Sequence, residues 1–96
     1  MNRKEHLLTI MSEECLEIAK EISKGLRFGL EDHHPTQTGT NAQKINHEFN
    51  DLVAVMEMLR DDGHLSVDID RELVKTKKER VEKYLLYSQD KGTLNE

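Results

Sequence analysis

The sequence lacks tryptophan and has one proline, one cysteine and only four Phe or Tyr side chains among 96 residues. The single cysteine, Cys15, cannot form an intrachain disulfide, and nothing in the sequence indicates a cysteine-based zinc site. Because it falls on the apolar face of the first predicted helix, we expect it to pack as a core residue. No apolar run approaches the roughly 20 residues that a membrane-spanning helix requires. We therefore expect a cytosolic chain with no signal peptide and no membrane partner.

The net charge of the chain restricts the classes of binding partner that we expect. A formal net charge of −5 argues against nucleic acid as the main partner, because proteins that bind it present a basic face. The sequence has neither a G-x-x-x-x-G-K-[ST] phosphate loop nor an EF-hand loop, and its histidines show no recognisable metal-ligand spacing. Small anionic ligands remain compatible with this composition if a metal ion supplies the positive charge.

Length and composition predict a single all-α domain over residues 1–96. Hydrophobic residues make up 35% and charged residues 34% of the chain, a balance that is typical of amphipathic helices with one buried face. A chain this short buries only a modest share of its surface. We therefore expect an antiparallel bundle of about three helices whose core is completed in a homodimer or tetramer.

Apolar residues at helical spacing predict where the helices lie. The predicted helices cover residues 2–24, 41–60 and 67–87. Thr40 followed by Gln43 fits a capping box that starts the second helix. The polar segment of residues 25–41 is long for so small a domain, and such loops are often functional. A polar tail is expected from about Ser88.

Two acidic pairs are the most informative feature of the chain. Glu14 with Glu17, and Glu48 with Asp51, each have i, i+3 spacing on a predicted helix. Residues three apart on a helix are neighbours on one face. Two such pairs facing each other would repel strongly unless a hard divalent cation lay between them, and Mg²⁺ prefers oxygen ligands.

Glu48 is the sharpest of these positions, because it falls inside the apolar stripe of its helix. An ionised carboxylate in that position must be paired, hydrogen-bonded or metal-bound. The alternative to metal is an ion pair with a basic residue, for which the candidates are Lys77, Arg80 and Arg27. Glu21 shares the face of the first acidic pair, as either a further ligand or a supporting group.

These motifs resemble a known family, the MazG-like all-α nucleoside triphosphate pyrophosphohydrolases. The segment Glu13–Glu17 is similar to their E-E-x-x-E opening, and His47–Leu52 is similar to their E-x-x-D motif. Further segments resemble the small, often phage-encoded, members of the family: Leu26–Leu30, Pro35, Thr40–Asn41, Lys77, Arg80 and Lys83–Leu85. The segment between the two acidic motifs is long for the family, and its excess falls in the loop.

The resemblance implies hydrolysis of a (deoxy)nucleoside triphosphate between its α and β phosphates, in the cytoplasm of the host if the chain is phage-encoded. The implied cofactor is Mg²⁺, with Mn²⁺ as a substitute, held by four catalytic carboxylates: Glu14, Glu17, Glu48 and Asp51. The implied substrate-binding residues are Lys77 and Arg80 for the phosphates and Arg27, Phe28 and Asn41 for the base and sugar.

Two alternatives stay open on the sequence. The nearer one is a related pyrophosphohydrolase that acts on another diphosphate-linked substrate, such as a phosphoribosyl nucleotide or an alarmone. The other is a helical module without catalytic activity that senses nucleotides or binds a protein partner. It predicts that folding is indifferent to Mg²⁺ and that no substrate is turned over.

Overall fold

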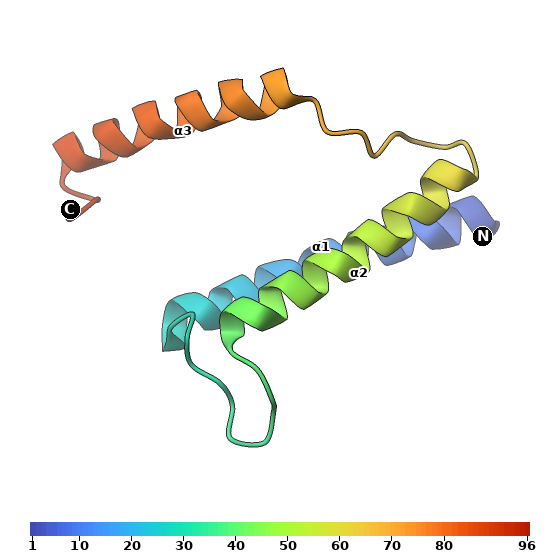
Figure 1. Cartoon of the computed structure of the whole chain (residues 1–96), viewed down its shortest axis with the longest axis horizontal. Coiled ribbons are helices and arrows are strands. Elements are labelled where there is room, and N and C mark those ends of the chain that lie inside the picture. Colours follow the sequence, from blue (N-terminus) through green and yellow to red (C-terminus); the bar gives the residue numbers. More distant parts are fainter.

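The computed structural model describes all 96 residues and contains three α-helices and no strand (Figure 1). Helix α1 spans Arg3–Phe28, α2 spans Asn41–Asp61 and α3 spans Arg71–Lys91. The predictions of an all-α chain and of three main helices are confirmed. No helix is long and apolar enough to cross a membrane.

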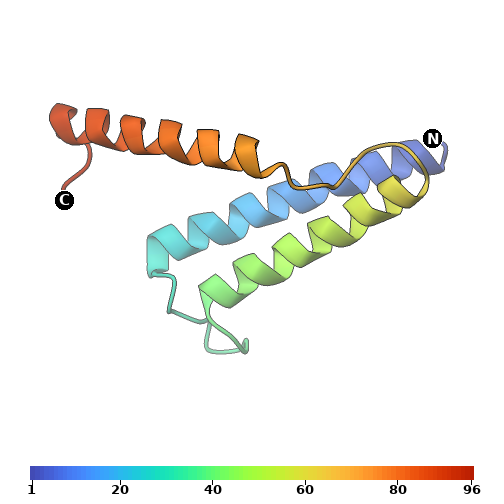
Figure 2. The same cartoon turned by 45° about the horizontal axis from the view of Figure 1, so that its top comes forward.

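Helices α1 and α2 pack against each other as an antiparallel pair (Figures 1 and 2). The predicted capping box begins α2: the backbone N–H of Gln43 donates to Thr40 Oγ1 at 3.2 Å, and that of Thr40 donates to Gln43 Oε1 at 2.8 Å. At the far end of the pair, Leu59 is fully buried and Leu7 nearly so. This end holds the only strongly buried apolar side chains of the chain.

The two helices meet along a seam with the alternating three- and four-residue spacing of helix pairs. The α1 residues buried or half-buried at this spacing are Leu7, Met11, Glu14, Ile18, Glu21 and Gly25. The corresponding α2 residues are Asn41, Ile45, Glu48, Leu52, Val55 and Leu59. Acidic side chains therefore occupy positions inside the seam, where a helical pair usually places apolar ones.

The prediction that Cys15 is a core residue is wrong, because its side chain is exposed. The apolar stripe of α1 consists of Leu7, Met11, Cys15, Ile18, Ala19, Ile22 and Leu26. The seam runs through Glu14 and Glu21, along the acidic edge of that stripe. The other edge of that stripe, which includes Cys15, Ile22 and Leu26, therefore lies outside the contact with α2. Leu26 is 88% exposed.

Helix α1 also extends beyond its predicted end at Lys24, and the loop begins later than predicted. Gly25 is buried inside the helix, where an added Cβ would lie 2.9 Å from Leu30 Cδ2. The helix ends at Gly29, whose positive φ of 99° favours glycine and whose N–H donates to the Gly25 carbonyl at 2.8 Å. The first glycine thus serves close packing of the loop, and the second one ends the helix.

Helix α3 is displaced by four residues at both ends from its predicted bounds of residues 67–87. Asp70 is the N-cap, and its carboxylate accepts from the backbone N–H groups of Glu72 and Leu73 at 3.0 and 3.1 Å. The polar segment that was predicted from about Ser88 begins inside the helix, which continues up to Lys91. The helix stops at Gly92, which has the left-handed conformation that glycine favours at this position.

Helix α3 runs back from the end of α2 but does not pack on the pair (Figure 2). No Cα of α3 lies within 8 Å of a Cα of α1 or α2. Its apolar face is open to solvent: Leu73 is 68% exposed and Tyr84 is 61% exposed. The completion of the bundle through a second chain therefore stays a prediction.

Candidate metal centre

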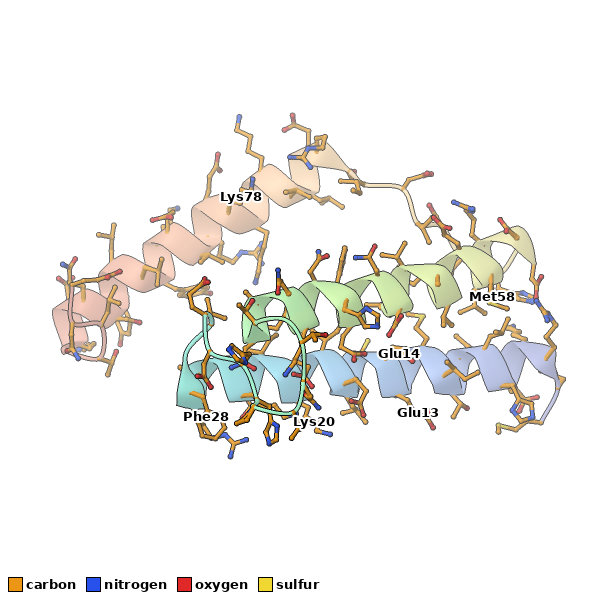
Figure 3. All side chains as sticks on the ribbon, turned by 60° about the horizontal axis from the view of Figure 1, so that its bottom comes forward. Glu13, Glu14, Lys20, Phe28, Met58 and Lys78 are labelled. Atoms are coloured by element: carbon orange, nitrogen blue, oxygen red, sulfur yellow. The ribbon has the colours of Figure 1, made fainter.

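The acidic residues of the two predicted motifs come together in the seam between α1 and α2. Glu14 from α1 and Glu48 and Asp51 from α2 each place a carboxylate oxygen within 4.8 Å of the other two. All three side chains are half-buried. Figure 3 shows Glu14 between the two helices, whereas its neighbour Glu13 points away from α2.

The electrostatics of this group centre on Glu48. Burial raises the pKa of Glu48, and the nearby charges of Asp51, Glu14 and Glu17 raise it further, while His47 opposes the shift. The ionised form of Glu48 is therefore less favourable here than in water unless positive charge is added. Three oxygen donors in one half-buried group match what a hard divalent cation needs, so the residues present fit Mg²⁺.

Glu17, the fourth predicted ligand, lies at the edge of this group. It is exposed and outside the three carboxylates that lie within 4.8 Å of one another. Its charge still raises the pKa of Glu48. Its role as a ligand remains a prediction.

The side chain of His47 is largely exposed on α2. Its Nε2 nevertheless lies 3.6 Å from Asp51 Oδ2. The i, i+4 spacing of His47 and Asp51 is the signal in the sequence that could have revealed this pair. A residue that sequence reasoning set aside therefore adjoins the carboxylate group.

A polar cavity of about 500 Å³ opens beside these carboxylates. Its lining residues are all polar: Glu21, Thr36, Gln37, Thr38, Lys44, His47 and Glu48. Glu48 belongs both to this lining and to the carboxylate group. A ligand in the cavity would therefore lie next to a cation held by Glu48.

Two of the three residues predicted to bind base and sugar lie together at the loop end of the pair. Phe28 and Asn41 line a second, smaller cavity of about 230 Å³. The Asn41 side chain is buried and donates to the Gly29 carbonyl at 2.9 Å, so it also holds the loop in place. Arg27 is exposed, and its guanidinium lies 4.9 Å from the centre of the Phe28 ring.

The predicted phosphate-binding residues, Lys77 and Arg80, are not brought to the carboxylates within one chain. Both are exposed on α3, and α3 makes no close backbone approach to the other helices. An ion pair between Glu48 and either of them is therefore absent from the structure, and Arg27 makes none with it either.

Comparisons with protein-family models, with curated proteins and with solved structures gave no match.

Proposed function

We propose that the chain is a Mg²⁺-dependent nucleoside triphosphate pyrophosphohydrolase that releases a (deoxy)nucleoside monophosphate and pyrophosphate. The observation that supports this best is the meeting of Glu14, Glu48 and Asp51 in the seam of α1 and α2. These are residues of the two motifs that resemble the MazG-like family. The resemblance supplies the reaction class, and the carboxylate group supplies a reason to bind metal.

A bound cation would relieve the repulsion that the fold has built into this group. Without positive charge, the raised pKa of Glu48 means that its ionised form is held at a cost. Glu14, Glu48 and Asp51 would hold the ion, and Glu17 is proposed as the fourth ligand because it follows Glu14 by one helical turn. When bound, Mg²⁺ supplies charge to phosphate oxygens and lowers the pKa of a coordinated water.

The chain's own groups position the substrate in this scheme. Lys44 lines the polar cavity beside Glu48 and offers a positive charge to the phosphates. Attack by water on the α phosphorus breaks the α–β anhydride, and pyrophosphate leaves. Catalysis of this kind depends mainly on positioning and charge stabilisation.

Lys77 and Arg80 enter the proposed site from a second copy of the chain. They lie on the same face of α3 as its apolar residues, two of which, Leu73 and Tyr84, are mostly exposed. A single chain leaves this face and the outer edge of α1 uncovered, which is a large apolar surface for a chain of this size. A homodimer or tetramer would bury both.

Charge favours the same arrangement. Helix α3 carries seven Lys or Arg and four Asp or Glu, a net charge of +3. The whole chain carries −5, so the rest of it carries −8. A basic helix of one copy is therefore attracted to the acidic pair of another.

Product analysis tests the proposed activity. The purified protein is incubated with Mg²⁺ and each common ribo- and deoxynucleoside triphosphate, and the products are separated by ion-exchange chromatography. Monophosphate plus pyrophosphate supports the proposal, whereas diphosphate plus orthophosphate would identify another phosphohydrolase. Turnover only of phosphoribosyl nucleotides or alarmones would support the nearer alternative. No turnover with Mg²⁺ or Mn²⁺ would favour the module without catalytic activity.

A further inference from the structure

Glu21 is a buried carboxylate that the proposed metal centre does not use. Its side chain is only 9% exposed, and Oε1 lies 3.3 Å from Lys24 Nζ. The other oxygen, Oε2, is buried and has no hydrogen-bond partner. Buried polar atoms are nearly always hydrogen-bonded, so an unpartnered carboxylate oxygen requires a reason.

The position of Glu21 suggests that the reason is a ligand. The residue lines the polar cavity of about 500 Å³, together with Lys44, Glu48 and the loop residues Thr36–Thr38. The ammonium of Lys44 donates to the Gln37 side chain and so ties this loop to α2. The cavity is therefore lined by Glu21 together with this tied loop, and it shares Glu48 with the carboxylate group.

The chemistry of Oε2 restricts what can lie against it. A carboxylate oxygen either accepts a hydrogen bond from an N–H or O–H group or coordinates a cation, and the group that would hold the proposed cation, Glu14, Glu48 and Asp51, does not include Glu21. Phosphate oxygens are acceptors with negative charge and would be repelled. In a nucleoside triphosphate, the donors that can meet it lie in the nucleoside: the N–H groups of the base and the hydroxyls of the sugar.

We propose that Glu21 is a specificity-determining residue that accepts a hydrogen bond from an N–H or O–H donor of the substrate's nucleoside. This inference rests on the proposed function, since it takes the phosphates to lie at Glu14, Glu48 and Asp51. The phosphates then lie at the part of the polar cavity lined by Glu48 and Lys44, and the nucleoside enters the part lined by Glu21 and satisfies its buried oxygen. Burial makes such a bond selective, because a substrate without the donor leaves the oxygen unpaired.

The test measures binding directly, by calorimetric titration of the full chain with α,β-imido nucleoside triphosphates in the presence of Mg²⁺. Glu21→Met keeps the length of the side chain and removes the acceptor. Its affinity for the preferred analogue should fall about 10- to 100-fold, the size expected for a hydrogen bond to a charged group. The matched control is Glu13→Met, a change on the side of α1 that points away from α2 (Figure 3).

Nucleotide analogues that each lack one hydrogen-bond donor identify the donor that Glu21 contacts. The panel compares deoxy with ribo and dideoxy sugars, and guanine with hypoxanthine. Removal of the donor that Glu21 contacts should weaken binding to the wild type but not to Glu21→Met, which is the coupling that a direct contact gives. Dependence on a hydroxyl would place the sugar at Glu21, and dependence on an amino group would place the base there.

The outcomes separate this inference from the function beneath it. If the wild type binds analogues and Glu21→Met binds all of them equally well, the specificity role is wrong and the proposed function stands. If the wild type binds none of the analogues, the proposed function fails and the inference falls with it. Should Glu21→Met not fold, Glu21→Leu serves instead because it also lacks an acceptor, and an unchanged ranking of the analogues would overturn the proposal.

Discussion

Helices α1 and α2 on one side and α3 on the other are amphipathic in similar ways, but only the first two find a partner within the chain. The pair buries Leu59 completely at one end and holds three carboxylates in its seam. In α3 no residue is buried, and its apolar face is turned to solvent. An apolar stripe at helical spacing therefore indicates that one face of a helix will be buried, but it does not indicate which segment or chain buries it.

The two regions also differ in charge: the pair of α1 and α2 is acidic, and α3 is basic. Burial and the neighbouring carboxylates of the pair raise the pKa of Glu48, so added positive charge would stabilise its ionised form. Helix α3 carries the excess of positive charge, with Lys77 and Arg80 on its apolar face. We expect the positive charge at Glu48 to come from Mg²⁺ and from the α3 of a second copy.

The largest predicted effect comes from a change in the seam that leaves α3 intact. Glu48→Gln removes a proposed metal ligand, and loss of charge stabilisation of several kcal/mol would reduce hydrolysis by about 100-fold or more. Initial rates of pyrophosphate release, measured beside Glu13→Gln as the control, test this. Activity close to that of the wild type would show that Glu48 is not a ligand.

The second prediction concerns whether Lys77 of α3 serves the carboxylate group of its own chain or that of a second copy. Lys77→Ala should lower activity about tenfold or more, because it removes a charge from the phosphates. Lys78→Ala, one position along the same exposed helix, is the control. Glu48→Gln mixed with Lys77→Ala should then regain activity, since a mixed dimer contains one site with both residues intact.

Random reassortment into dimers would restore about a quarter of the sites. The two variants are mixed in equal amounts, unfolded and refolded together, and their activity is compared with the mean of the separate proteins. Recovery to well above that mean would show that α3 serves the partner's site. Activity equal to the mean would show that Lys77 acts within its own chain or not at all.

Sequence reasoning found the number of helices and the capping box of Thr40 and Gln43, because these depend on local chemistry. It also found that Glu48 lies inside the contact face of α2. It misplaced Cys15, because it centred the buried face of α1 on the most apolar side chains. The actual seam is shifted toward Glu14 and Glu21. The contact with α2 determines this shift, and the sequence of α1 alone does not reveal it.

The helix ends show the same limit. The first helix was predicted to end before Gly25, but the lack of a side chain at Gly25 serves the approach of Leu30 from the loop. The sequence alone does not show that the loop folds back onto the helix and brings Leu30 against Gly25. The predicted start of α3 at residue 67 was too early, because Asp68 is engaged in a turn with Ser66 and Asp70 caps the helix.

The third prediction compares one leucine from each region. Leu59→Ala removes the fully buried side chain of the pair and should destabilise the fold by about 2–5 kcal/mol. Leu85 is 41% exposed in the single chain, so Leu85→Ala should cost less than about 0.5 kcal/mol when no second copy is bound. Urea unfolding followed by circular dichroism measures both.

Protein concentration sharpens this test. If α3 packs on a second copy, the effect of Leu85→Ala should grow with concentration, because association stabilises the folded state by mass action. Light scattering on the same samples reports the mass, and the variant should dissociate at higher concentrations than the wild type. A small effect of Leu85→Ala at all concentrations, with a monomeric mass, would refute the proposed assembly.

The smallest predicted effect is the dependence of stability on pH that the seam imposes. The pKa of Glu48 is higher in the folded chain than in the unfolded one, where it is about 4.3. The folded state therefore binds more protons between those two values, and stability falls as pH rises through that window. Glu48→Gln removes this loss and should raise the Tm of the metal-free protein at neutral pH.

The gain from Glu48→Gln should vanish below about pH 4, where the carboxyl is protonated in both states. Added Mg²⁺ should reverse the order at neutral pH, because it binds the folded wild type through Glu48 and stabilises it by mass action. Thermal scans from about pH 3.5 to 8, with and without Mg²⁺ and beside Glu13→Gln, resolve both effects. A constant difference in Tm across this range would mean that the charge of Glu48 does not limit stability. The repulsion in the seam would then no longer support a cation site.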